Sequence, residues 1–318
     1  KDFPVIVRLT VDECYKEIGR EGVGYTLDEG VQMAKALDKA GVDAIDVSSA
    51  SYDTYNYWLE PTSFEPGWRK YMAAAVKKEV SVPVLAANLI RSPKQAEEQL
   101  EEGIQDFVCL GRPHIADPHW ANKVMEGRED EIKRCICCLY CMESMQHNAY
   151  CGTHANCSVN PMLGHEKEQL KKDGNGRTVV IVGAGAAGLT AAEFLGKRGF
   201  KPIVLEKQAQ AGGQLQLADK PPLKDKIDWC VEDLVTACEK NGAEIRYNTT
   251  ADEDTIAALD PYAVVIATGA LAVRPRSIPG TDLPTVYTTT EILDGSIKLS
   301  GKKVAVIGSG MTGLETAE

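Results

Sequence analysis

The sequence predicts an α/β protein built from parallel sheets, and two observations support this fold class. Short β-rich runs alternate with amphipathic helical stretches over about the first 127 residues. Further along, two glycine-rich turns, at 183–188 and 308–313, each follow an apolar run and open a helical stretch. A strand, a helix and a second strand form the repeating unit of parallel sheets. We therefore expect at least two α/β domains within the 318 residues.

The first domain shows four strand patterns separated by helical patterns. The strands are expected at 3–9, 43–49, 82–88 and 106–111, and the helices at 26–41, 67–80 and 92–103. Gly41 is a helix stop signal, while Ser92 and Pro93 are start signals at the N-cap and the first helical position. Four strands cannot close an eight-stranded barrel, so this region is either an open sheet or the second half of a (β/α)8 barrel.

Composition favours chemistry on small molecules. The chain has 46 acidic and 35 basic residues, a net charge of -11, which argues against binding to nucleic acid or to anionic membranes. No apolar run is long enough to span a bilayer. No signal peptide is evident, so the ten cysteines are interpreted as thiols of a cytoplasmic protein rather than as disulfides. Both ends lie inside element patterns, so we expect the middle part of a longer chain.

The first glycine motif has the features of a dinucleotide-binding turn. Gly183, Gly185 and Gly188 follow the strand pattern "VVIV" and open a helix. In such turns the glycines permit a tight bend, close approach to a pyrophosphate and close packing of helix on strand. Glu206 ends the next strand, where a carboxylate can accept a hydrogen bond from an adenosine ribose.

A second copy of this motif lies near the end of the sequence, after the pattern "VAVI". Its glycines are Gly308, Gly310 and Gly313. Between the copies lie "GGQL", which contains Gly213 and Gln214, and "VVIATGA", which contains Gly269. Spacing alone predicts only that each copy binds a dinucleotide. The arrangement resembles the two-dinucleotide-domain flavoprotein reductases, which implies FAD at the first motif and a nicotinamide at the second.

The segment "CICCLYC" predicts a metal centre. Cys135, Cys138 and Cys141 have C-x-x-C-x-x-C spacing, so a tight loop can direct three sulfurs to one point while a fourth comes from further along. Three close cysteines with a distant fourth favour a [4Fe-4S] cluster over zinc, which usually takes two separated C-x-x-C pairs. Zinc, and free or disulfide-linked thiols, remain alternatives.

The ordered set of motifs resembles the iron-sulfur branch of the Old Yellow Enzyme-like flavoproteins, which includes 2,4-dienoyl-CoA reductase, 2-enoate reductase, the bile-acid enoate reductases and trimethylamine dehydrogenase. The matching stretches are "VRL", "GVDAIDVSSASY", "VPVLAAN", "LGRPHIADP", "RCICCLYCM", "CSVNP" and both dinucleotide motifs. The resemblance implies Cys157, before "VNP", as the fourth ligand. Cys137 stands where the family usually has glycine, and the spacing to Cys157 is longer than usual, so replacement of a ligand by Cys137 or Cys151 stays open.

The resemblance also implies FMN at the carboxyl ends of the first-domain strands. Gly111 and Arg112 match the phosphate-binding Gly-Arg pair, and Asn88 lies at the equivalent end of the preceding strand. Arg8 matches an arginine beside the flavin ring, with an ion pair at the barrel mouth as the alternative. Tyr52 either helps to donate a proton or lines the substrate pocket, and a histidine expected after it is replaced by Asp53.

The domain boundaries expected from these motifs divide the chain into five parts. They are the second half of an FMN-binding TIM barrel (1–127), a cluster segment (128–165), a linker (166–176), an FAD-binding domain (177–300) and the start of an NAD(P)H-binding unit (301–318).

The expected function is that of an NAD(P)H-dependent ene-reductase. Electrons would pass from NAD(P)H through FAD, the cluster and FMN to an activated C=C of a small molecule. The rival interpretations are an amine dehydrogenase of the trimethylamine dehydrogenase type and an electron-transfer module without substrate chemistry. The identity of the substrate, the choice between NADH and NADPH and a homo-oligomeric state of the full-length protein stay open, and the principal proton donor is expected outside this chain.

Overall fold

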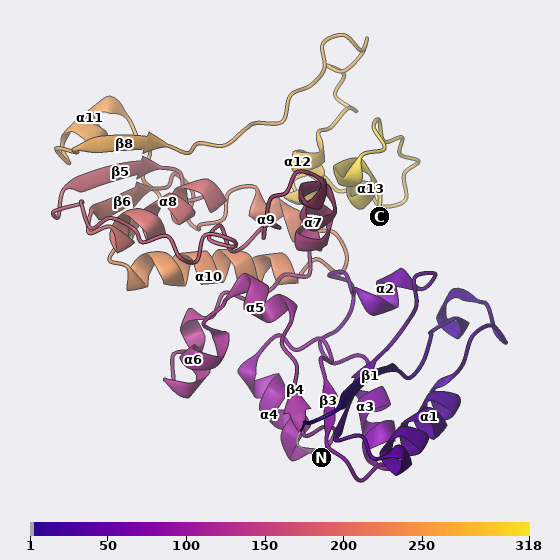
Figure 1. Cartoon of the computed structure of the whole chain (residues 1–318). Coiled ribbons are helices and arrows are strands. Elements are labelled where there is room, and N and C mark those ends of the chain that lie inside the picture. The colour runs from indigo at the N-terminus through magenta and orange to yellow at the C-terminus, as the bar shows by residue number, and fades with distance from the viewer. Residues whose placement is uncertain (1–2) are drawn as a thin grey trace. The chain divides into compact units, whose positions relative to one another are not determined.

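The computed structural model describes residues 3–318, which form two compact units. The first unit extends to Glu166 and the second covers Lys167–Glu318. Each unit contains one four-stranded parallel sheet (Figure 1). The parallel α/β class predicted from the sequence is therefore confirmed, whereas the finer division into five parts stays a prediction.

In the first unit the strands lie side by side in chain order, and every neighbouring pair is parallel. The strands are β1 (Ile6–Thr10), β2 (Ala44–Ser48), β3 (Val84–Ala86) and β4 (Phe107–Val108). The helices that connect or follow them are α1 (Leu27–Ala40), α2 (Tyr55–Trp58), α3 (Lys70–Lys77), α4 (Pro93–Glu101), α5 (Arg112–Ala116), α6 (Trp120–Met125) and α7 (Tyr140–Tyr150), with short 3-10 turns at Lys16–Ile18 and Glu129–Glu131. This order is that of consecutive strands in a (β/α)8 barrel and equally that of an open sheet.

The local helix signals act as the sequence predicts. Helix α1 ends at Gly41, which adopts a left-handed conformation with φ of +85°. Helix α4 starts after Ser92, whose hydroxyl accepts a hydrogen bond from the backbone amide of Gln95 at 3.2 Å, and has Pro93 in its first turn. These caps fix where the helices lie along the sheet.

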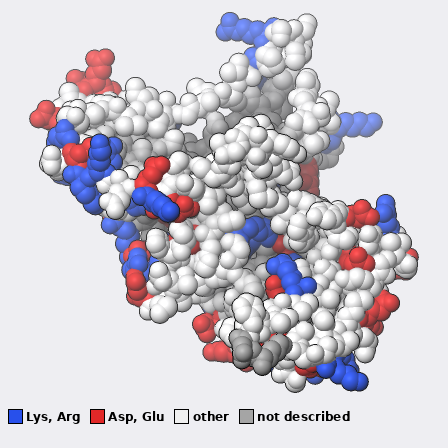
Figure 2. Space-filling view, viewed as in Figure 1, with Lys and Arg blue, Asp and Glu red and all other residues white. Residues whose placement is uncertain are grey.

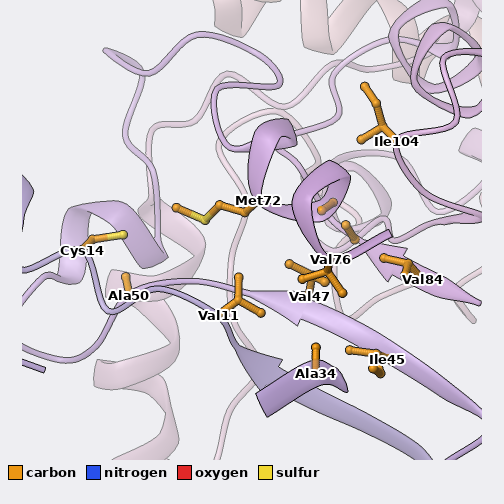
Figure 3. Close-up of a cluster of buried hydrophobic side chains, with 12 residues drawn as sticks. Val11, Cys14, Ala34, Ile45, Val47, Ala50, Met72, Val76, Val84 and Ile104 are labelled. Atoms are coloured by element: carbon orange, nitrogen blue, oxygen red, sulfur yellow. The ribbon is translucent and has the colours of Figure 1, made fainter. Parts of the chain in front are cut away.

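The hydrophobic core of the first unit covers one face of its sheet. Ala34 from α1 and Met72 and Val76 from α3 pack against Ile45 and Val47 of β2 (Figure 3). All five side chains are buried. The apolar positions of the strands alternate with polar ones, so burial of this face directs the alternate residues to the other face.

That opposite face of the sheet is open in this chain. It presents Ile6 and Phe107, which are 56% and 57% exposed, and the polar side chains of Arg8 and Asp46. Arg8 and Asp46 are register partners on neighbouring strands and form an ion pair at 3.3 Å. The face is therefore mixed in character, with apolar side chains beside charged ones.

The second unit has the strand order β7-β6-β5-β8. Its strands are β5 (Thr178–Val182), β6 (Lys201–Leu205), β7 (Glu244–Arg246) and β8 (Ala263–Ile266), and its helices are α8 (Ala186–Lys197), α9 (Leu215–Ala218), α10 (Lys226–Lys240), α11 (Glu253–Ala257), α12 (Thr289–Leu293) and α13 (Met311–Ala317). Leu189 of α8 and Leu234 of α10 pack on Ile181 and Val204, while Val180 faces a smaller cluster under α11. The central strand β5 is thus covered on both faces, as in doubly wound folds.

The strand expected before the second glycine motif is the main difference in secondary structure. Residues 304–307, "VAVI", are not a strand, and Val304, Val306 and Ile307 are exposed. A strand exists through hydrogen bonds to a neighbour, and within residues 3–318 no strand pairs with this run. The helix that follows, α13, does form.

Acidic and basic side chains are interspersed on the face shown in Figure 2. None of the helices described within residues 3–318 combines the length and the apolar character needed to cross a bilayer.

Candidate functional site

The turn between β5 and α8 is built so tightly that two of its glycines cannot carry a side chain. A Cβ on Gly183 would lie 2.5 Å from the carbonyl oxygen of Ala267, and φ of Gly183 is +104°. A Cβ on Gly188 would lie 1.9 Å from the carbonyl oxygen of Gly183. Both contacts are with backbone, which cannot move aside cheaply, so these positions require glycine for folding.

Gly185 differs, because a Cβ there would meet nothing within 4 Å. Gly185 caps the N-terminus of α8 without a side-chain hydrogen bond, so the first amides of this helix have no capping side chain. Gly212 donates its amide to Ala184 O at 2.8 Å, and Gly213 lies against the Gly185 backbone. The start of α8 therefore borders an open space lined by side-chain-free backbone, which fits the pyrophosphate of a dinucleotide.

Glu206 lies beside this turn, at the end of β6. Its carboxylate is buried and accepts the amides of Ala184 and Gln208, both at 2.8 Å. Each carboxylate oxygen keeps a lone pair for a ribose hydroxyl. Gln214 donates its side-chain amide to the carbonyl of Ala270 at 2.6 Å, which ties "GGQL" to the loop after β8, next to Gly269. The residues predicted for FAD in this unit are thus brought together, and their roles in binding stay predictions.

The second glycine motif repeats the geometry of the first. Gly308 has φ of +110°, Gly310 caps α13, and a Cβ on Gly313 would lie 2.2 Å from the Gly308 carbonyl oxygen. A Cβ on Gly310 would meet nothing within 4 Å. The second turn therefore resembles the first, except that a Cβ on Gly308 would meet nothing within 4 Å, and nicotinamide binding there stays a prediction.

At the carboxyl end of the first-unit sheet, Arg112 is held by a buried carboxylate. Its guanidinium donates to the carbonyl oxygen of Glu60 at 2.7 Å and to Oε2 of the same residue at 2.5 Å. Oε1 of Glu60 accepts from Trp68 Nε1 at 3.1 Å and pairs with Arg69 at 3.2 Å. The residue next to Arg112, Gly111, borders open space, since a Cβ there would meet nothing within 4 Å. A guanidinium beside an open glycine fits the phosphate of a flavin mononucleotide.

Asn88, Arg8 and Tyr52, the other residues predicted around FMN, differ in their exposure and in their contacts. The side-chain amide of Asn88 is buried and donates to Gln99 at 3.1 Å and to Gln105, so it is already engaged in the interior. Arg8 forms the ion pair with Asp46, which was the alternative interpretation of that residue. Tyr52 is 85% exposed and packs edge-on against Trp58 at 5.6 Å between ring centroids. Roles of all three toward a flavin or substrate stay predictions.

Cys135, Cys138, Cys141 and Cys157, the four predicted ligands, are not joined in disulfides. Burial raises the pKa of the Cys141 and Cys157 thiols, and the charges of Cys135 and Cys138 add to the rise. Cys141 and Cys157 therefore both lie within electrostatic range of Cys135 and Cys138. Among residues 3–318 no three His, Cys, Asp or Glu side chains are grouped closely enough to hold a single metal ion. Four thiols at one locus suit an iron-sulfur cluster chemically, and the ligand set stays a prediction.

The two spare cysteines of this segment are in contrasting positions. Cys137 is buried, has φ of +55°, and accepts a hydrogen bond from Arg91 Nε at 3.0 Å. Cys151 is exposed at the end of α7. The hydrogen bond with Cys137 and the charge of Arg91 lower the pKa of Cys135. The Cys137 thiol is thus engaged in a hydrogen bond with Arg91.

Arg112 connects the sheet end with the cysteine segment. Besides bonding Glu60, its charge adds to the lowering of the pKa of Cys135, which the hydrogen bond with Cys137 dominates. Burial raises the pKa of Cys141, and Arg112 acts against that rise. Within the first unit the charge of Arg112 therefore acts through space on the cysteine segment, while its hydrogen bonds go to Glu60.

Sequence reasoning missed Glu60, Arg69 and Arg91. Each is a charged residue inside an apolar or aromatic stretch, "YWLEP", "GWRKY" and "NLIRS". Such placement is a weak sign of a buried charge that needs a partner. It does not reveal which distant residue that partner is.

Comparison with known proteins matches the two units to two families. Residues 1–131 match the NADH:flavin oxidoreductase / NADH oxidase family, and residues 177–318 match the pyridine nucleotide-disulphide oxidoreductase family. FMN, FAD and NAD(P)H are the cofactors of these domains, and related reductases and dehydrogenases carry [4Fe-4S] clusters.

Individual relatives align with this chain across both units. The chain is 40% identical over 323 residues to an NADH oxidase of Thermoanaerobacter brockii and 33% identical over 328 residues to a cinnamate reductase of Clostridium sporogenes, and covers 48% of each. A solved structure of 2-naphthoyl-CoA reductase is 29% identical, with a TM-score of 0.89 over 99% of this chain and 47% of that one. The chain spans about half the length of these relatives.

With these matches in order, and with similarity to such reductases along the whole of this chain, residues 1–131 belong to the NADH:flavin oxidoreductase / NADH oxidase family and residues 177–318 to the pyridine nucleotide-disulphide oxidoreductase family.

Proposed function

We propose that the full-length protein carrying this chain is a cytoplasmic enzyme that reduces an activated C=C of a small molecule with electrons from NAD(P)H. FAD, a [4Fe-4S] cluster and FMN would supply hydride and single-electron transfer between nicotinamide and substrate. The observation that carries the proposal is that Arg112, held by the buried Glu60, lies beside the open Gly111 in a chain that resembles such reductases along its whole length.

The residues of this chain would bind and orient these groups. Arg112 and the open Gly111 would hold the FMN phosphate, in the second half of a (β/α)8 barrel. Cys135, Cys138, Cys141 and Cys157 would hold the cluster. The start of α8 and Glu206 would hold FAD, and the turn before α13 the nicotinamide nucleotide.

The first test is the cofactor content of the full-length protein, purified without oxygen. We expect about one FMN, one FAD, four iron and four sulfide per chain, and electron paramagnetic resonance of a cluster after dithionite reduction. Cinnamate serves as the probe of an activated C=C, with NADH and NADPH as donors. NAD(P)H-dependent loss of cinnamate absorbance is the expected activity.

The variant Cys157→Ala tests the role of the cluster in electron transfer separately from the binding of FAD and NAD(P)H. This variant should keep FAD and NAD(P)H-dependent reduction of an artificial acceptor, but lose iron, sulfide and cinnamate reduction together. Cys151→Ala is the matched control, because that thiol is exposed at the end of α7. One zinc without sulfide would contradict the proposal, as would full iron content in Cys157→Ala.

A further inference from the structure

Three charged side chains are buried together at the carboxyl end of the first-unit sheet. The side chains of Glu60, Arg69 and Arg112 are 1%, 8% and 14% exposed, and Glu60 pairs with both arginines, at 3.2 Å and 2.5 Å. Arg112 is 52 positions from Glu60 in the sequence, so the fold brings it to the Glu60–Arg69 pair. Neither of these two ion pairs lies at the surface.

The charges of this cluster do not balance. Two guanidiniums share one carboxylate, which leaves a surplus of one positive charge. Desolvation lowers the pKa of Arg69, which shows that burial opposes its charged form. The nearby carboxylate of Asp46 also interacts electrostatically with Arg69. It is paired with Arg8, however, and so does not neutralise the surplus positive charge. A buried unpaired charge is costly unless a partner of opposite charge binds.

Arg69 also has an unused donor. Its Nη1 donates to Ser49 Oγ at 2.9 Å, while its buried Nε has no hydrogen-bond partner within residues 3–318. Ser49 directly follows β2, and Arg112 begins α5 shortly after β4. Both arginines therefore meet at the strand ends where ligands of parallel α/β sheets bind.

We propose that Arg69 is a second cation of a buried anion site, with Glu60 as the positioning residue that holds Arg69 and Arg112 together, and that its ligand is the phosphate monoester of FMN. The inference rests on the proposed function for the flavin. A phosphate monoester carries more than one negative charge and accepts several hydrogen bonds, so it can use the surplus charge and the free Nε together. A carboxylate has a single negative charge and two oxygens, so it would match the surplus charge and the free Nε less well.

The test compares FMN with riboflavin, which lacks the phosphate. Full-length protein is freed of FMN with FAD left in place, and each flavin is titrated by its fluorescence quenching. The ratio of the two dissociation constants then measures phosphate recognition alone. A loss of packing would weaken both flavins and leave the ratio unchanged.

Charge counting predicts opposite results for two variants. Arg69→Met leaves a neutral pair of Glu60 and Arg112, so the preference for FMN should fall about tenfold or more. The double variant Glu60→Gln/Arg69→Met again carries one positive charge, with the Gln oxygen able to accept from Arg112. Its preference for FMN should return toward the wild-type value. Arg69→Lys, which keeps the charge, should retain much of the preference even if Arg69→Met does not fold.

The matched control is Arg20→Met, which removes an exposed arginine paired with Asp53 at 3.8 Å. It should leave the ratio unchanged. An unchanged ratio in Arg69→Met, or a further fall in the double variant, would overturn the anion site. A wild-type protein that holds FAD but binds no FMN would instead overturn the proposed function. Equal wild-type affinities for FMN and riboflavin would overturn the phosphate assignment alone.

Discussion

Cys137 shows how a single backbone conformation can explain a residue preference. Its φ of +55° lies in the left-handed region, where glycine is favoured because it has no Cβ. The family resemblance places glycine at this position. The chain instead has a buried thiol that accepts a hydrogen bond from Arg91. The backbone therefore keeps the left-handed conformation, and the side chain is stabilised by this hydrogen bond.

Cys137→Gly should therefore leave the iron and sulfide content of the full-length protein unchanged. The substitution suits the backbone and removes a thiol that is engaged with Arg91 rather than needed as a ligand. Iron and sulfide analysis checks this, with Cys138→Ala as the contrasting variant that should lose the cluster. Iron loss in Cys137→Gly would make Cys137 a ligand.

Asp117 gives a prediction for pH dependence. Burial raises the pKa of this carboxyl, but hydrogen bonds from Lys123, at 2.5 Å, and from the amides of Lys133 and His119 outweigh it, so the pKa is lowered. A carboxyl with a lowered folded pKa stabilises above its unfolded value, about 3.9. That contribution is lost as the pH falls through the folded value.

Asp117→Asn should consequently destabilise the segment 117–133 at pH 7 by about 1–3 kcal/mol, and have little effect in acid, at a pH low enough to protonate the wild-type carboxyl. Denaturant unfolding of the full-length protein at the two pH values measures the difference. Asp173→Asn, which weakens an exposed pair with Arg198, is the control and should change stability little. An equal loss from Asp117→Asn at both pH values would mean that the ionised carboxylate is not the cause.

Among the elements, the β5–α8 turn separates glycines needed for folding from one left free for a ligand. Gly188→Ala should disrupt the turn, because the new Cβ would lie 1.9 Å from a carbonyl oxygen. Gly185→Ala should fold normally, since the space beside it is open, yet lose most FAD affinity because its methyl group would occupy the pyrophosphate position.

FAD content and circular dichroism together check both variants. Gly188→Ala should lower the melting temperature and the FAD content, and Gly185→Ala the FAD content alone. Gly310→Ala, the equivalent open position of the second motif, should retain FAD and weaken nicotinamide binding. Normal FAD content in Gly185→Ala would remove this turn from the FAD site.

The elements that the sequence predicts well are those set by local chemistry. Ser92 and Gly41 mark helix ends because capping involves residues within one turn. The run at 304–307 has the same apolar pattern as β5 but is not a strand, because a strand also needs a neighbour to pair with. The contacts of Glu60 with Arg112 span 52 positions, and no local pattern encodes such a pairing.

At the scale of the whole molecule, the open face of the β1–β4 sheet is the surface that we expect another part of the protein to cover. Phe107 and Ile6 are exposed on it although they sit in strands of a parallel sheet, and such sheets are normally covered on both faces. The relatives are about twice as long as this chain. We expect the remaining part of the protein to cover this face as the other half of a barrel.

Phe107→Ser should therefore destabilise the full-length protein by about 1.5–3 kcal/mol and change the stability of the 318-residue chain little. Thermal unfolding of both forms, with and without the substitution, measures the two effects. Tyr150→Ser, at a position 94% exposed in α7, is the control that should matter in neither form. Equal effects of Phe107→Ser on both would mean that nothing covers the face.

The charge of Arg112, which acts at the sheet end and through space on Cys135 and Cys141, has a consequence for both predicted sites. A charge that interacts with an anion on one side and with thiolates on the other makes the two equilibria dependent on each other. If a bound anion changes the proton or metal affinity of Cys135 and Cys141 by a certain factor, then binding of a proton or metal at those sulfurs changes the affinity for the anion by the same factor. The order in which the protein acquires its cofactors would then change the path of assembly but not its end point.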